Sequence, residues 1–219
     1  MFLDFGKLAA KDRYKLLTAT VVPRPIALVS TRNEDGSTNA APFSFFNVFS
    51  EDPPLIVLGL QSKPDFSPKD TAHNIRLTGE FVVNLVDEEI AEKMVICAAD
   101  FPKNESEILA ANFSLAKSRN IDVDYIVDAP VSLECRRITV LQFAKTRDLA
   151  VGEIVGFHAR EGLIDPDTLR VNWDKYNPIG RLYADQYIHT HDRFSMRIPA
   201  YEDAVNEEYS KTVGDRQPD

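Results

Sequence analysis

The sequence predicts a mainly β protein with flanking helices, in which antiparallel strands close into a barrel. Two long runs rich in Val, Ile and Leu, residues 129–143 and 149–163, are joined by residues 145–148 and predict a hairpin. Shorter apolar runs separated by turn signals precede them, and only a few segments have helical spacing. Strands spaced in this way with few helices are typical of a closed antiparallel barrel.

The N-terminal region predicts one helix and the first two strands. Apolar and charged residues mix over residues 2–17 in a pattern that suits a short amphipathic helix ending before Val21. Residues 26–31 predict a strand, and Asp35-Gly36 supplies the positive-φ positions of the hairpin turn after it. The second strand leads directly into residues 39–47.

A buried strand and a helix with clear start signals come next. Residues 55–60 are continuously apolar, which indicates a strand buried on both faces. The helix has Ser67 as its N-cap, Pro68 as its first residue and Asp70 as an acid that can close a capping box. We expect it to end near Gly79.

The following segments carry weaker signals. Residues 81–86 predict a strand, and residues 87–97 and 104–111 predict two short helices. Residues 99–128 otherwise predict irregular surface, and residues 173–187 show no clear pattern.

Length and charge limit the class of protein. The 219 residues suit one domain, which we expect over residues 1–203, followed by a polar, mobile tail over residues 204–219. No apolar run is long enough to cross a bilayer and the start lacks an export signal, so we expect a cytoplasmic protein. A net charge of −9 argues against nucleic acid or a membrane as a partner.

Residues 39–47 form the most unusual stretch, because Phe43, Phe45 and Phe46 surround small and polar residues. A planar ligand could approach the backbone beside the small side chains while the rings wall it in. The alternative is a core crossing whose phenylalanines fill volume. These residues alone favour that alternative, since aromatic clusters are more often core.

Lys69 is unusual at the start of a helix, because a cation there opposes the helix macrodipole. A phosphate group bound at the helix N-terminus would remove this conflict. Arg24 and Lys63 are the other cations that an acidic chain could use for such an anion.

Several common sites are absent from the sequence. No Gly-x-Gly-x-x-Gly motif occurs, so a nicotinamide donor would have to stack on another cofactor. Cys97 and Cys135 match no metal-ligand spacing and suit buried thiols. His189 and His191 have metal-binding chemistry, but alternate residues on an expected loop lack an evident third ligand, so we expect no metal.

Six stretches taken in order are similar to one family. They are PRPIALVST at 23–31, NAAPFSFFN at 39–47, KDTAHNI at 69–75, GEFVVN at 79–84, VGEIVGFH at 151–158 and PIGRL at 178–182. Together they resemble the flavin reductase-like proteins of the FMN-binding split-barrel fold, in particular the flavoredoxin type. The resemblance extends over roughly residues 17–198.

The resemblance implies a six-stranded antiparallel split barrel that binds one FMN per subunit and forms a homodimer. It implies an NAD(P)H-dependent flavin reductase, with NADH or NADPH as a transient electron donor and a small-molecule acceptor. The alternative is an FMN electron-transfer protein that a redox protein partner reduces. A more distant alternative is a nonredox small-ligand binding module on the same barrel.

The residues and the resemblance together suggest the site. Backbone N–H groups of residues 44–47 would face the flavin N1 and C2 carbonyl. His158 and Arg181 would position the nicotinamide or acceptor, although a buried, satisfied histidine is an equally good interpretation of His158. Asp65-Phe66 and Tyr183 depart from the family pattern, which leaves the substrate open. The expected cofactor-binding residues are Arg24, Asn39, Ser44, Phe45, Phe46, Asn47, Lys63, Lys69, Asp70, Thr71 and Asn74.

Overall fold

The computed structural model describes residues 1–102 and 105–204. The chain divides into two compact units, Met1–His189 and Thr190–Asp219. In the second unit the described part includes one short helix, α5 (Tyr201–Ala204). Apart from Ala204, the expected mobile tail lies outside the described residues.

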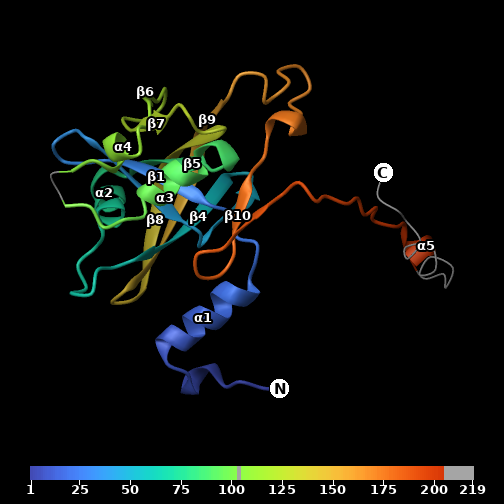
Figure 1. The fold of residues 1–219 in the computed structure, drawn as a ribbon, viewed down its shortest axis with the longest axis horizontal. Helices are drawn as coiled ribbons and strands as arrows, with labels where there is room; N and C mark the ends of the chain where they lie inside the picture. The colour runs from blue at the N-terminus through green and yellow to red at the C-terminus, as the bar shows by residue number, and fades with distance from the viewer. Residues whose placement is uncertain (103–104, 205–219) are drawn as a thin grey trace. The chain divides into compact units, whose positions relative to one another are not determined.

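Seven strands of the first unit form one antiparallel sheet in the order β2-β1-β5-β8-β9-β4-β3 within the described residues (Figure 1). They are β1 (Ala27–Arg32), β2 (Thr38–Phe43), β3 (Phe46–Glu51), β4 (Pro54–Gln61), β5 (Glu80–Leu85), β8 (Val131–Ala144) and β9 (Arg147–Ala159).

The sheet closes because its two edge strands are neighbours in the chain. Only Ser44 and Phe45 separate the end of β2 from the start of β3. The sheet must therefore curl until its edges meet. The Gly59 amide of β4 donates to the Phe45 carbonyl at 2.7 Å, which continues the β3–β4 pairing into this connection. With β2 and β3 counted as one bent strand, six runs form the barrel. The predicted split-barrel class is confirmed, and the strand count differs because the chain changes partner strand at Ser44.

Alternating side chains of the strands fill the barrel. Ile56, Leu58 and Leu60 of β4 are buried, whereas the residues between them are half-buried. The strand at 55–60 is thus predicted correctly, but only one of its faces is fully covered. Phe81 is fully buried in the same core, and Gly152 leaves room for it, because a Cβ at Gly152 would lie 2.5 Å from the ring.

Helices lie around the barrel rather than between its strands. α1 (Ala10–Thr20) projects from the barrel before β1, and α3 (Ala91–Ile96) and α4 (Glu107–Ala110) contact β2 (Figure 1). A 3-10 turn, η2 (Glu88–Ile90), precedes α3, and η1 (Phe5–Lys7) precedes α1. Within the described residues, none of the helices is long and apolar enough to span a membrane.

The predicted start of the second helix is wrong. α2 spans Asp70–Thr78, its N-cap is Lys69, and that residue makes no side-chain capping bond. Ser67 does not cap the helix, because its hydroxyl donates to Asp65 Oδ1 at 2.6 Å. Pro68 instead forms a β-bridge with Ser62. The end at Gly79 is confirmed, with φ of 74°.

Short elements appear where the sequence predicted irregular chain. β6 (Leu115–Lys117) pairs with β7 (Asp124–Ile126), and β10 (Ile179–Arg181) pairs with β11 (Tyr187–His189). Strands of three residues are too short for a periodic signal, which explains why they were missed. A further 3-10 turn, η3, covers Trp173–Lys175.

Two predicted boundaries also move. β9 ends at Ala159 rather than at residue 163. α4 begins after Ser106, whose hydroxyl accepts the Leu109 amide at 3.4 Å. Asn104, the expected start of that helix, lies outside the described residues.

Candidate flavin site

Ser44, in the connection between β2 and β3, lines two partly polar cavities. The first, the Lys69 cavity, has a volume of about 200 Å³. The second, the Arg181 cavity, has a volume of about 240 Å³. Both cavities are lined by Tyr14, Pro42, Phe43 and Ser44.

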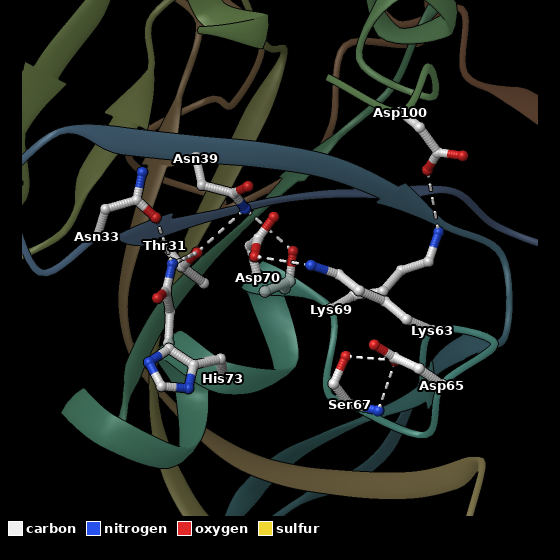
Figure 2. Close-up of polar contacts among 12 residues, drawn as sticks. Thr31, Asn33, Asn39, Lys63, Asp65, Ser67, Lys69, Asp70, His73 and Asp100 are labelled. Atoms are coloured by element: carbon white, nitrogen blue, oxygen red, sulfur yellow. Dashed lines mark hydrogen bonds and ion pairs between the residues drawn. The ribbon is translucent and has the colours of Figure 1, made fainter. Parts of the chain in front are cut away.

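The Lys69 cavity is bordered by the loop that precedes α2. Lys69 Nζ lies 3.5 Å from Asp100 Oδ1, and Lys63 Nζ lies 3.4 Å from Asp70 Oδ1. Figure 2 shows the two ammonium groups directed at these carboxylates. Both pairs are largely exposed, so they are weak and a bound anion could compete with them.

Arg24 is buried, with 7% of its surface exposed, and it ties three segments together. Its guanidinium donates to the carbonyls of Thr18 at 2.6 Å and Leu182 at 2.6 Å. Its Nε donates to the Ser44 hydroxyl at 3.4 Å. Burial lowers the pKa of Arg24, and the nearby Tyr14 phenol acts against this shift. Arg24 therefore lines the Arg181 cavity and, through these bonds, also fixes the cavity's shape.

Asn39, Thr71 and Asn74 belong to a buried network between α2 and the first two strands. Figure 2 shows Asn39, Thr31 and Asn33 of this network. The Asn39 amide donates to Thr71 Oγ1 at 3.0 Å and to Thr31 Oγ1 at 3.2 Å. The Asn74 amide donates to Thr31 Oγ1 at 3.0 Å and to Asn33 Oδ1 at 2.8 Å. These predicted site residues thus hold the start of α2 against the barrel.

A third, apolar cavity of about 420 Å³ lies between α1 and the start of β3, and Arg24, Ser44 and Phe45 also line it. Leu17 and Phe49 line it and are exposed. Phe46 also lines it and packs into the barrel core. Asn47 faces this cavity as well, and its side-chain oxygen accepts the Val48 amide at 2.8 Å.

Arg181 lies on β10, directly across from Arg24. The two backbones exchange hydrogen bonds, from Arg24 N to Arg181 O at 3.0 Å and from Arg181 N to Arg24 O at 2.8 Å. The Arg181 guanidinium stacks over the Tyr187 ring at 4.4 Å and donates to the Ala184 carbonyl. Its side chain borders the cavity that Ser44 lines.

His158 is placed elsewhere, in a cavity of about 590 Å³ that it shares with Glu134. His158 Nε2 lies 2.5 Å from Glu134 Oε1, and its ring stacks on Tyr125 with centroids 4.1 Å apart. Glu134 is fully buried and accepts the Arg119 and Asn120 amides at 2.7 and 2.8 Å. Desolvation alone would raise the pKa of Glu134, but these bonds outweigh it and lower that pKa. His158 and Arg181 therefore line different cavities of the chain.

The family model described as a flavin reductase like domain matches residues 19–180. The chain belongs to the flavin reductase-like family. The predicted resemblance is therefore confirmed, and the family implies that the protein binds a flavin.

Solved structures agree with this assignment. A 2-nitrobenzoate 2-nitroreductase from Pseudomonas fluorescens is 43% identical, with a TM-score of 0.84, over 92% of this chain and 98% of that one. Component B of nitrilotriacetate monooxygenase from Bacillus cereus is 33% identical, with a TM-score of 0.84, over 90% and 98%. Flavoredoxin from Desulfovibrio vulgaris is 19% identical, with a TM-score of 0.70 over 91% and 99%, which shows the shared fold alone.

Sequence reasoning missed two residues of the candidate site. The sequence pattern identified Tyr14 only as a residue of an amphipathic helix. Tyr187 lies in a segment in which the sequence shows no clear pattern. Both line the Arg181 cavity. No local signal marks them, because α1 and β11 reach Ser44 through the fold rather than through the sequence.

Proposed function

We propose that this flavin reductase-like chain binds FMN in the Lys69 and Arg181 cavities and catalyses its reduction by NADH or NADPH. The observation that carries this proposal is the meeting of the two cavities at Ser44. Small-molecule sites commonly have volumes of roughly 300–1,000 Å³. Neither cavity alone reaches that range, and the two together do.

The residues present fit a flavin mononucleotide. Phe43 and Phe45 give the Lys69 cavity aromatic walls against which a planar ring can pack. Lys69 offers a cation beside the start of α2, where the first backbone N–H groups of the helix also attract an anion. One phosphate suits this arrangement, so we propose FMN rather than FAD.

Bound FMN would supply the redox chemistry, accepting hydride from a nicotinamide and passing electrons to an acceptor. The chain would contribute binding and orientation. We propose that the backbone around Ser44 presents N–H donors to the ring edge, where reduction places negative charge. Lys63 and Lys69 would hold the phosphate, with Asp70 releasing Lys63 for this contact.

Arg181 borders the proposed ring site and would position the nicotinamide or the acceptor. Asn39, Thr71 and Asn74 would act through the position of α2, because their amide donors already bond within their network. His158 would reach the ring only from a second subunit, since it lines another cavity of its own subunit.

A homodimer is part of the proposal. Exposed apolar side chains surround the apolar cavity, where an exposed cluster of this kind is typical of an interface. The exposed residues that line the cavity are Leu17, Val21 and Phe49, and the exposed Val48 precedes Phe49 in the chain. Sedimentation at micromolar concentration should show twice the chain mass, and a monomer that retains FMN would contradict the dimer.

The decisive experiment uses the purified full-length protein. Ligand released by denaturation is identified by mass spectrometry, and the protein loaded with that flavin is titrated anaerobically with NADH or NADPH. We expect FMN, and loss of the flavin absorbance with one of the nucleotides. Recovery of FAD, or of protein that binds no flavin, would contradict the cofactor assignment.

The same titration separates the flavin reductase from the electron-transfer alternative. A protein that retains FMN and is reduced by dithionite but by neither nucleotide would act as an electron carrier for a protein partner. That outcome would agree with the proposed FMN site and contradict the proposed reduction by NADH or NADPH.

A further inference from the structure

Tyr14 of α1 occupies a position at the site that neither its sequence context nor the family motifs explain. It lines both the Lys69 cavity and the Arg181 cavity. Its ring lies 6.1 Å from the Phe45 ring, centroid to centroid, with the planes tilted by 51°. Half of its surface is nevertheless exposed, so it does not serve to fill the core.

The helix that carries Tyr14 is held mainly at one end. Among the α1 residues, all of which the structure describes, only Thr18 is buried. The Arg24 guanidinium donates to the carbonyls of Thr18 and Val21, at 2.6 and 3.1 Å, and so fixes the C-terminal end of α1. The remainder of the helix projects from the barrel (Figure 1).

The same arginine links this helix end to Ser44. Thr18 follows Tyr14 by one helical turn, and its hydroxyl donates to the Tyr14 carbonyl at 2.9 Å. Arg24 Nε donates to the Ser44 hydroxyl at 3.4 Å. Tyr14 is therefore positioned relative to the site wall through two linked contacts, rather than by the packing of α1 on the barrel.

We propose that Tyr14 is a ring-contacting residue that covers the bound flavin from the side of α1. This inference rests on the proposed function, because it requires a flavin in the two cavities. A phenol ring beside Phe45 provides a second aromatic surface for a planar ring. The chemical class of ligand it favours is a flat, electron-poor heterocycle, because the tyrosine ring is electron-rich.

The inference predicts a spectroscopic signature that a structural role would not produce. A phenol in contact with an excited flavin donates an electron to it and quenches its emission, whereas a phenylalanine ring does so poorly. Tyr14→Phe keeps the aromatic surface and removes the donor. Tyr14→Ala removes both.

The experiment measures the emission of bound FMN and its dissociation constant in the full-length protein and in three variants. Lys11→Ala is the control, because Lys11 is an exposed residue of the same helix. Tyr14→Phe should raise the emission several-fold while its dissociation constant stays within about twofold of the wild-type value. Tyr14→Ala should raise the emission and weaken binding by roughly three- to tenfold, the range of one aromatic contact.

Two outcomes would overturn the inference and leave the proposed function standing. One is a wild-type protein that binds FMN while both Tyr14 variants keep its emission and affinity. The other is a Lys11→Ala protein whose FMN emission and dissociation constant change as much as those of the Tyr14 variants. The effect would then come from the helix as a whole and not from the Tyr14 ring. A wild-type protein that binds no flavin would overturn both proposals.

Discussion

The Phe45 carbonyl accepts the Gly59 amide at 2.7 Å, and a Cβ placed on Gly59 would lie 2.9 Å from the Phe45 Cβ. This contact joins β4 to the two residues that connect β2 with β3. The end of the β3–β4 pairing and the wall of the Lys69 cavity therefore share this pair of residues, because Phe45 and Gly59 both line that cavity.

Gly59→Ala should strain this contact, because the added methyl carbon would lie closer to the Phe45 Cβ than Cβ atoms lie to other atoms in real structures. Overpacking of this kind costs about 1–3 kcal/mol of unfolding free energy. Urea unfolding would measure the loss, and FMN titration should show weaker binding. Gly6→Ala is the control, since a Cβ there meets only the exposed Asp4 side chain. Equal stability of the two variants would contradict the prediction.

Arg24→Ala should lower the free energy of unfolding by about 2–3 kcal/mol, because it removes a charged donor from buried carbonyl acceptors. It should also weaken FMN binding, since Ser44 and α1 lose their common contact. Arg13→Ala is the matched control, because Arg13 also donates to a carbonyl, that of Phe5, but at an exposed position. A similar loss in both variants, measured by chemical denaturation, would show that the burial of Arg24 has no special effect.

Lys69→Ala should weaken FMN binding by about 1.5–3 kcal/mol if Lys69 makes a charge-assisted bond to the phosphate. Riboflavin has the same ring without the phosphate, so its affinity should stay unchanged. Equilibrium titration with both ligands makes this comparison within one protein. Lys117→Ala, which removes an exposed lysine on β6, should change neither affinity. If Lys69→Ala weakened the binding of FMN and of riboflavin equally, Lys69 would not bind the phosphate.

Glu134 should make stability depend on pH. The pKa of its carboxyl group lies below the ordinary value in the folded protein, where desolvation is outweighed by the Arg119, Asn120 and His158 bonds. The ionised group therefore stabilises the fold above its unfolded pKa of about 4.3. That contribution is lost as the pH falls through the lower folded pKa.

Glu134→Gln should accordingly be less stable than the wild type at neutral pH, and the difference should narrow as the solution is acidified below about pH 4. Thermal unfolding across a pH series would measure it. Glu153→Gln is the control, because Glu153 is a partly exposed residue of the neighbouring strand. A difference between wild type and Glu134→Gln that stays constant with pH would contradict the prediction.

The sequence by itself determined the class of fold and the family. Alternating and continuous apolar runs predicted the barrel strands, because strand formation leaves a period that a short window contains. Gly79 correctly marked the end of α2, since a left-handed backbone at a helix end favours glycine. The motif stretches identified the family because several of them occur in order along the chain.

The tertiary structure decided how the site is built. Arg24 is predicted from sequence as a phosphate ligand, yet its strongest contacts are to carbonyls, one of them at Leu182, far along the chain. Lys69 becomes the N-cap of α2 because Ser67 bonds to Asp65 instead. His158 lies with Glu134, and Tyr14 lies at Ser44. These placements depend on contacts between distant segments, and local patterns of residue type carry no information about such contacts.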